Sequence, residues 1–208
     1  MSRLAPVYSA LDRTGLLLLL RQLHPGRLIL CYHNVVGRGS IPQGDASLHL
    51  ALEEFESQVE WVARHYRVVS LSTLLAESRE ATSSARPLAA ITFDDAYSGV
   101  LLNALPALRR RQLPSTIFVT MNASNEPTHY WWDHVASLRP RVDRLALRDQ
   151  HGGCAAEILE VTGLAATEAP LPAEYLPADW GALRAASDED LSFGAHTRTH
   201  PMLTMQSD

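Results

Sequence analysis

Short, continuous apolar runs alternate along the chain with segments whose apolar residues recur at helical spacing. A continuous run predicts a buried strand, because the strands of a parallel sheet are covered on both faces. Five strands are predicted in this way, at residues 28–32, 67–71, 89–93, 115–119 and 191–195. Their alternation with helices predicts an α/β fold whose strands form a parallel sheet or barrel.

Two predicted helices each have one apolar face. These faces consist of Phe55, Val59, Val62 and Tyr66 in the first helix, and of Leu101, Leu105 and Leu108 in the second. Pro106 lacks a backbone donor, so the second helix is expected to bend or split there. Ser72 is expected to cap a further helix that continues to Glu77.

The remaining segments are less regular. Residues 1–26 are expected to form an amphipathic helix on the domain, and residues 126–178 an insertion that bears one or two helices. The apolar run at residues 16–20 is too short to span a bilayer and lacks a cleavage pattern of small residues. We therefore predict no transmembrane segment and no signal peptide, and a location in the cytoplasm or peripheral to the membrane.

Composition narrows the class of protein. A chain of 208 residues with 46% apolar content fits one globular domain with a sizeable core. The net charge is −5, and apart from three arginines at residues 109–111 there is no long run of like charge, so nucleic acid is not an expected partner. Cys31 and Cys154 are too few for a disulfide framework, and Cys31 is expected to be buried.

Polar side chains follow two of the predicted strands, at the strand ends where α/β folds concentrate their chemistry. Asp94 and Asp95 follow one strand, and His196 and His200 follow another. The His-x-x-x-His spacing lets two imidazoles bind one ion, and a carboxylate completes three ligands, which leaves a position open for water. An open position is typical of a catalytic metal. The alternative is a capping carboxylate and two exposed histidines.

The adjacency of the two carboxylates sets a further condition. Neighbouring side chains on an extended strand point to opposite faces. Asp94 and Asp95 are therefore expected to lie beyond the strand end, on a turn from which both reach one cavity. A bound cation would offset their mutual repulsion.

Two motifs carry a family resemblance. The sequences Ile-Thr-Phe-Asp-Asp at residues 91–95 and Gly-Ala-His-Thr-Arg-Thr-His-Pro-Met-Leu at residues 194–203 resemble the first two motifs of the polysaccharide deacetylases. These enzymes form carbohydrate esterase family four and share the NodB homology domain. Further similarity lies at residues 29–33, 55–75, 114–119 and 131–133. The resemblance thus implies a polysaccharide deacetylase-like catalytic domain at residues 27–208.

The resemblance also implies a role for the motif residues. Asp95, His196 and His200 would bind a divalent metal, commonly Zn2+ in this family. Asp94 would be the general base. The implied function is a metal-dependent hydrolase that removes acetyl groups from an N- or O-acetylated carbohydrate, with metal-bound water as the nucleophile. Its partner would be an acetylated glycan or glycoconjugate.

Other residues near the motifs are candidates for the same site. The backbone N–H of Tyr97 matches the position that the family uses to stabilise an oxyanion, although Ala96 precedes it where the family usually has glycine. Trp132 and Asp133 are candidates for substrate binding, because aromatic faces suit the apolar side of a sugar ring. Core packing is an equally good interpretation of the aromatic residues in this part of the sequence, which are Tyr130, Trp131, Trp132 and Trp180.

The resemblance implies a distorted (β/α) barrel of seven or eight strands, whereas five are predicted. The fold is therefore expected to be incomplete at its C-terminal end, and its unpaired edge at residues 191–195 to favour self-association. The family's general-acid histidine and base-orienting arginine would lie beyond Asp208. His33 either faces the same cavity or is a packed core histidine, as lone histidines near strands usually are.

Two alternatives to an active deacetylase remain. The chain would be a truncated relic that binds metal or glycan, since loss of a general acid typically costs about 10²–10⁴-fold in rate. Otherwise it would hydrolyse another non-peptide C–N bond, such as that of a cyclic amide, on the same scaffold.

Overall fold

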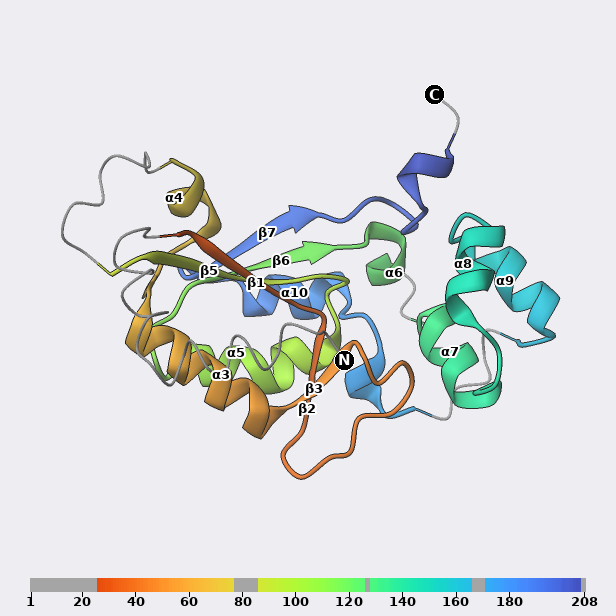
Figure 1. Cartoon of the computed structure of the whole chain (residues 1–208), viewed down its shortest axis with the longest axis horizontal. Coiled ribbons are helices and arrows are strands. Elements are labelled where there is room, and N and C mark those ends of the chain that lie inside the picture. Colours follow the sequence, from red (N-terminus) through yellow and green to blue (C-terminus); the bar gives the residue numbers. More distant parts are fainter. Residues whose placement is uncertain (1–25, 77–85, 126–127, 166–170, 207–208) are drawn as a thin grey trace, which may run out of the picture.

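The computed structural model describes residues 26–76, 86–125, 128–165 and 171–206 (Figure 1). The helix expected at residues 1–26 lies outside them except for Gly26, and so does Glu77, the expected end of another helix. Among the described helices, none is long and apolar enough to cross a membrane.

The five predicted strands form one sheet in which every pairing is parallel, so the predicted α/β class is confirmed. They are β1 (Leu28–Tyr32), β4 (Arg67–Val68), β5 (Leu88–Phe93), β6 (Ser115–Val119) and β7 (Leu191–Ala195). The order is β1-β5-β6-β7, and β4 also pairs with β5. All six residues of β5 are buried, as expected for a central strand of a parallel sheet.

The strand register brings the functional segments to one edge of the sheet. Tyr32 at the end of β1 is level with Phe93 at the end of β5, and Val119 at the end of β6 is level with Ala195 at the end of β7. Ligand sites of parallel sheets form at the carboxyl ends of the strands. The segments that follow β1, β5 and β7 therefore meet at this edge.

The second predicted strand is shorter than expected. β4 ends at Val68, and the next helix, α4 (Leu71–Ala76), begins where the strand was expected to continue. The prediction that Ser72 caps this helix is wrong: the Ser70 hydroxyl accepts a hydrogen bond from the Thr73 N–H at 3.1 Å. A cap lies just before the first helical turn. Residues 67–71 were assigned to a strand because they are mostly apolar, so the earlier start of the helix was not recognised.

A second, small sheet was not predicted. It consists of β2 (Asn34–Val36) and β3 (His49–Ala51), paired in parallel. Three residues are too few for a strand pattern to stand out in the sequence. The pair matters for the site because it carries Asn34 and His49 into the protein interior.

Two of the helices have the predicted apolar faces. α3 (Leu52–His65) buries Phe55, Val59 and Val62, and the chain becomes extended at Tyr66. The predicted bend or split near Pro106 corresponds to a change of helix type: a π-helical turn, η2 (Val100–Ala104), is followed by α5 (Leu105–Arg109), with the proline in its first turn. Proline is tolerated there because its missing N–H has no partner at a helix start.

Seven further helical segments follow. They are α6 (Met121–Asn125), α7 (Trp131–Leu138), α8 (Arg144–Gln150), α9 (Ala155–Thr162), η3 (Ala173–Tyr175), α10 (Trp180–Ala186) and η4 (Leu203–Met205). Figure 1 shows α3, α5 and α10 along one side of the sheet, and α7, α8 and α9 gathered beyond the strand ends. The main apolar core joins both groups: Phe55 and Leu183 belong to it, and so do Trp131 and Ile158.

Candidate active site

The segment after β5 is a tight turn that holds both predicted carboxylates. The strand ends at Phe93, so Asp94 and Asp95 lie beyond it, as their adjacency required. Asp95 and Ala96 have φ angles of 68° and 54°, in the left-handed region. That conformation reverses the chain direction at once, and it costs free energy in a residue other than glycine. Asp95 is consequently turned into the interior, with 1% of its surface exposed.

The segment after β7 carries the two histidines on a second strained loop. Thr197 and His200 have φ angles of 62° and 58°. The His196 N–H donates to the Val119 carbonyl at 2.9 Å, and the His200 N–H donates to the Thr197 hydroxyl at 2.9 Å. Four of the five non-glycine residues with positive φ among the described residues thus flank this site. Strained backbone of this kind concentrates at functional sites.

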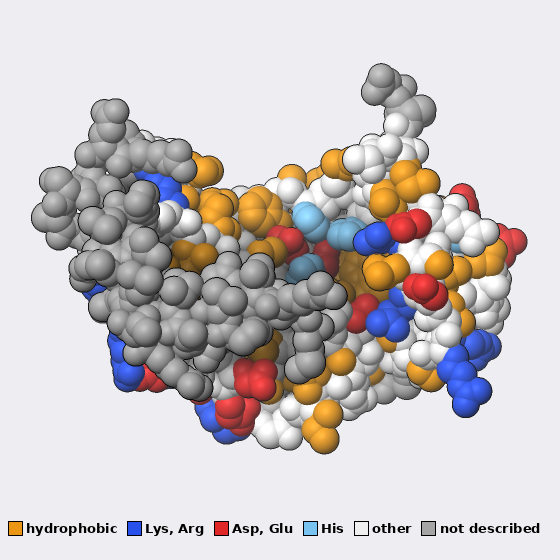
Figure 2. All heavy atoms as spheres, in the orientation of Figure 1, with side chains coloured by type: hydrophobic (Ala, Val, Ile, Leu, Met, Phe, Trp, Pro, Cys, Tyr) orange, Lys and Arg blue, Asp and Glu red, His pale blue; other side chains and the backbone are white. Residues whose placement is uncertain are grey.

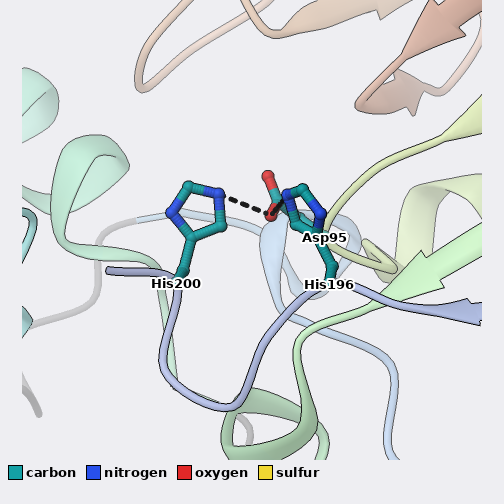
Figure 3. A group of neighbouring side chains, drawn as sticks. All are labelled: Asp95, His196 and His200. Atoms are coloured by element: carbon teal, nitrogen blue, oxygen red, sulfur yellow. Dashed lines mark ion pairs between the residues drawn. The ribbon is translucent and has the colours of Figure 1, made fainter. Parts of the chain in front are cut away.

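The two segments bring three potential ligands together (Figure 3). Asp95 Oδ1 lies 3.6 Å from His196 Nε2 and 3.4 Å from His200 Nε2. Their ligand atoms all lie within 4.8 Å of one another, and no other group of three such side chains is found in the described part of the chain. Figure 2 shows histidine side chains beside acidic side chains on one face of the molecule. One ion could contact all three residues.

The electrostatics of these residues fit a divalent cation. Asp95 Oδ1 is buried and makes no hydrogen bond with any described residue. Burial raises the pKa of Asp95 to about 8, with smaller contributions from Asp94 and Asp133. Burial, followed by repulsion from His196, lowers the pKa of His200 to about 4 and so keeps this imidazole neutral. A carboxylate with two imidazoles is a donor set that zinc binds, and a cation would offset the cost of the buried charge.

Asp94 directly precedes Asp95 in the turn after β5, and it lies next to the end of β1. Its backbone N–H donates to the Tyr32 carbonyl at 2.9 Å, and the Cys31 thiol donates to Asp94 Oδ2 at 3.2 Å. Partial desolvation, then the hydrogen bond and the charge of Asp94, raises the pKa of the Cys31 thiol to about 11, although the residue is exposed. The prediction that Cys31 is buried is wrong, because alternate residues of β1 point to an open face of the sheet and Cys31 is among them.

His33 follows β1, whose end is level with that of β5. It lines a cavity together with Cys31, Asn34 and His49, and none of the three potential ligands lines that cavity. Burial lowers the pKa of its half-buried imidazole, the negative charge of Asp94 opposes that shift, and His196 adds to it. Whether His33 faces the metal site stays a prediction.

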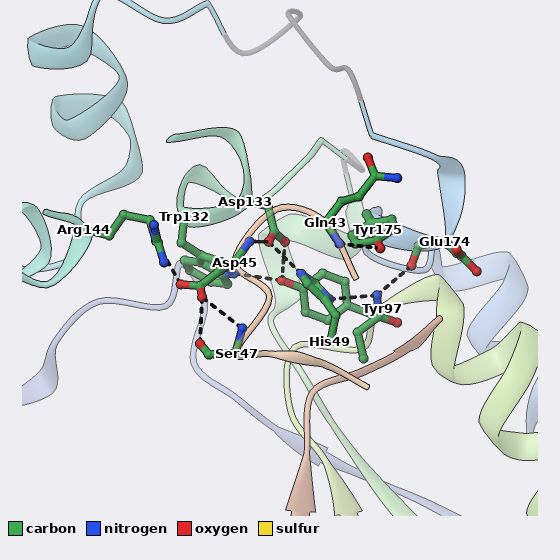
Figure 4. Close-up of polar contacts among 11 residues, drawn as sticks. Gln43, Asp45, Ser47, His49, Tyr97, Trp132, Asp133, Arg144, Glu174 and Tyr175 are labelled. Carbon is green, nitrogen blue, oxygen red and sulfur yellow. Dashed lines mark hydrogen bonds and ion pairs between the residues drawn. The ribbon is translucent and has the colours of Figure 1, made fainter. Parts of the chain in front are cut away.

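Tyr97 ends the turn, and its side chain is fully buried. Its backbone N–H donates no hydrogen bond to any described residue. Its hydroxyl donates to Asp133 Oδ2 at 2.7 Å (Figure 4). An unpaired backbone amide beside a metal site is a suitable donor to an oxyanion.

Trp132 and Asp133 lie in the interior rather than on an open surface. Asp133 has no exposed surface, so in this structure it does not reach a substrate. Trp132 is almost fully buried, and its ring centroid lies 4.9 Å from that of His200. Tyr130 and Trp131 are also in the core. Trp180 is half-buried and its indole N–H donates to Asn125.

The hydrogen-bond network around the turn was not found from the sequence. It joins His49, which no motif indicated, with the hydroxyls of Tyr97 and Tyr130, which were named for other roles. The three residues come from segments that are far apart along the chain. The neighbouring tryptophans were the one available signal, since buried tyrosines and tryptophans usually find polar partners.

Comparison with protein families places this site in context. A family model described as polysaccharide deacetylase matches residues 81–208, which is more than half of the chain. Both motifs lie within the matched region. A search among curated proteins found no match.

Two solved structures resemble this fold. A de-N-acetylase from Aggregatibacter actinomycetemcomitans is 15% identical, with a TM-score of 0.51, and the match covers 82% of this chain and 54% of that chain. The deacetylase PplD of Streptococcus pyogenes, solved in complex with acetate, is 16% identical, with a TM-score of 0.52 and coverage of 86% and 60%. The chain thus spans little more than half the length of the structures that it matches, and the likeness concerns the fold.

Proposed function

Because the chain belongs to the polysaccharide deacetylase family, we propose that it is a metal-dependent hydrolase that removes acetyl groups from an N- or O-acetylated carbohydrate. The observation that carries this proposal is the convergence of Asp95, His196 and His200 within 4.8 Å, with Asp94 beside them. A base next to an open three-ligand site is what hydrolysis of an acetyl group requires.

The metal would be Zn2+, held by Asp95 Oδ1 and by the Nε2 atoms of His196 and His200. These three atoms already face one another. When bound, zinc would lower the pKa of a water molecule to about 7 and polarise the acetyl carbonyl. The lowered pKa of His200 keeps its imidazole neutral and able to bind the ion, and the buried carboxylate of Asp95 supplies the negative charge.

Asp94 is proposed as the general base. It shares the turn with Asp95 but is half-exposed, so it can reach solvent and substrate while Asp95 stays buried. Its Oδ2 accepts a weak hydrogen bond from Cys31, which leaves Oδ1 available for the proton of the attacking water. The Tyr97 N–H would then donate to the carbonyl oxygen as negative charge develops there.

His33 is proposed as the donor of the second proton. Departure of an amine or alcohol requires a proton on the leaving atom, and a positioned imidazole is the commonest source. His33 follows Tyr32, whose carbonyl accepts from the Asp94 N–H, and the negative charge of Asp94 favours a protonated imidazole against the effect of burial. In this scheme Asp94 takes one proton from water, protonated His33 delivers one to the leaving group, and acetate is the other product.

The first experiment measures zinc by elemental analysis in the parent chain and in Asp95→Ala and His196→Ala. It also measures acetate release from chitin oligosaccharides and acetylated xylan. About one equivalent of zinc in the parent, little in both variants, and acetate release only by the parent would support the proposal. Absence of zinc from the folded parent would overturn it. Zinc without acetate release from any acetylated glycan would favour the catalytically impaired alternative.

Two further expectations stay predictions of the sequence. β7 pairs only with β6 among the described residues, so association of two chains through its other edge remains to be tested by sedimentation. A location in the cytoplasm or peripheral to the membrane is likewise proposed from the N-terminal sequence alone.

A further inference from the structure

Asp133, a buried carboxylate in the first turn of α7, is the centre of a hydrogen-bond network that includes the Tyr97 side chain (Figure 4). It accepts hydrogen bonds from His49 Nε2 at 2.7 Å, from the Asp45 N–H at 2.8 Å and from the Tyr97 hydroxyl at 2.7 Å. A carboxylate without exposed surface is costly unless donors surround it, and here three donors do so.

The direction of these hydrogen bonds follows from their partners. The Asn34 amide nitrogen lies 3.2 Å from the Glu174 carbonyl, which can only accept, so this nitrogen is a donor. The same nitrogen lies 3.1 Å from His49 Nδ1, which must therefore accept. His49 then carries its proton on Nε2 and donates it to Asp133. The chain of donors ends at the carboxylate.

Tyr97 is directed toward Asp133 in a similar way. The Trp132 indole N–H donates to the Tyr97 hydroxyl oxygen at 2.8 Å. The tyrosine hydroxyl is left with its own proton to give, and Asp133 Oδ2 takes it. The carboxylate thus fixes the far end of the side chain whose backbone closes the turn at residues 94–97.

Other contacts hold the backbone of the same turn. The Tyr130 hydroxyl donates to the Asp95 carbonyl at 2.5 Å, and the Ala178 N–H donates to the Ala96 carbonyl at 2.8 Å. Asp95 and Ala96 both have positive φ, so the turn needs outside support to stay in this conformation. Most of that support comes from the start of α7, which contributes Tyr130, Trp132 and Asp133.

The loop before β3 is shaped to reach the same carboxylate. A side chain at Gly44, which has a φ of +63°, would place its Cβ 2.5 Å from Asp133 Oδ1. Only glycine allows the backbone to come so close in that conformation. The loop, the start of α7 and the turn are therefore fitted to one another around Asp133.

We propose that Asp133 is a positioning residue for the metal site: through the Tyr97 hydroxyl it holds the turn that presents Asp95 and the Tyr97 N–H. It touches neither metal ligand nor substrate. This inference rests on the proposed function, because it assigns a support to the site that would bind zinc. Such outer partners of a metal site typically contribute about 10–100-fold to metal affinity or activity.

The test measures zinc affinity by competition with a chromogenic chelator, and the visible spectrum of the Co2+-substituted protein, which reports ligand geometry. The variants are Asp133→Asn, Tyr97→Phe and the double variant. Asp133→Asn keeps the volume but puts a donor where an acceptor is needed. We expect each single change to weaken zinc binding by about 10–100-fold and to alter the Co2+ spectrum. The double variant should lose no more than the weaker-binding single variant, because both changes break one connection.

Asp143→Ala is the matched control. Asp143 caps α8 by accepting from the Leu145 and Ala146 N–H groups, and it makes no contact with the turn. Its loss should lower the melting temperature but leave zinc affinity within twofold of the parent and the Co2+ spectrum unchanged. The control therefore separates a general loss of stability from a change at the metal site.

The outcomes are distinguishable. If the parent binds zinc and Asp133→Asn, folded by circular dichroism, binds it equally well with the same Co2+ spectrum, the positioning role is wrong and the proposed function stands. If Asp133→Asn does not fold, Tyr97→Phe decides, because it leaves Asp133 with His49 and Asp45. A folded parent that binds no zinc would overturn the proposed function and this inference together.

Discussion

The turn after β5 and the loop after β7 supply the two halves of the candidate metal site, and they are built differently. Asp95 comes from a central strand that is buried throughout, and 1% of its side chain is exposed. His196 and His200 follow an outer strand with three exposed residues, and 30% and 38% of their side chains are exposed. The carboxylate is fixed in the interior, whereas the imidazoles lie at its boundary with solvent.

This difference indicates how the two halves contribute to binding. Hydrogen bonds from Tyr130 and Ala178 hold the backbone of the turn, so Asp95 is preorganised. Its burial removes water from the carboxylate, which costs free energy. The side chains of His196 and His200 are partly exposed, so less desolvation opposes their binding to an ion. The turn also carries Asp94 and Tyr97, so a change there affects both metal binding and the proposed chemistry.

The strongest test separates the two carboxylates of the turn. Asp94→Asn removes the proposed base but preserves shape, so acetate release should fall by about 10²–10⁴-fold. Zinc content should stay near one equivalent, because Asp94 is not among the three proposed ligands. Loss of zinc together with activity would mean that Asp94 supports the turn rather than accepting a proton.

Removal of one ligand from each half should cost a similar amount of affinity. Structural zinc sites with four ligands bind with about 10–16 kcal/mol, or about 3 kcal/mol per ligand. Asp95→Ala and His200→Ala should each weaken zinc binding by at least about 10²-fold, measured by chelator competition. A much smaller loss in His200→Ala would show that the exposed half is dispensable, and the three-ligand site would then be incorrect.

The two halves should differ in how the metal-free protein responds to pH. The pKa of Asp95 is raised to about 8 in the folded state, above its ordinary value of 3.8. Between these values the folded state holds a proton that the unfolded state has lost, so stability falls as pH rises, by up to about 1.4 kcal/mol per pH unit. Thermal melts of the chelator-treated protein at pH 6.5 and pH 8 should show this decrease, because the lowered pKa of His200 opposes it only below the ordinary histidine value of 6.5.

The control for that pH effect is Asp95→Asn. It removes the titrating group, so its melting temperature should change less between pH 6.5 and pH 8 than that of the parent. Saturating zinc should likewise reduce the dependence in the parent. An equal pH dependence in parent and variant would assign the effect to other groups.

The smallest expected effect concerns Cys31, an exposed probe next to the turn. Its pKa is raised to about 11, so little thiolate is present at pH 8, and iodoacetamide labelling should accelerate about tenfold per pH unit up to pH 10. Asp94→Asn removes a negative charge beside the thiol and should increase the rate at pH 8 by about threefold or more. Mass spectrometry of the labelled peptide measures this, and unchanged labelling would contradict the contact.

Much of the fold was predictable because its signals are local. Each of the five strands in the main sheet lies in a mostly apolar run, and the change of helix type near Pro106 was expected from the missing N–H of that one residue. β2 and β3 were not predicted, because three residues are too few to show a strand pattern. The exposure of Cys31 was not predicted either, because an apolar run does not show which face of a strand is exposed.

The sequence by itself determined the three proposed ligands and the family, because each motif is a short segment directly after a strand and its spacing is set by the local backbone. Tertiary structure decided the rest of the site. His49 comes from a segment without a motif, and the role of Asp133 as a buried acceptor follows from no local pattern, because only the packing of α7 and β3 brings both residues to the Tyr97 side chain. The burial that raises the pKa of Asp95 is a property of the assembled core, since desolvation depends on every segment that excludes water.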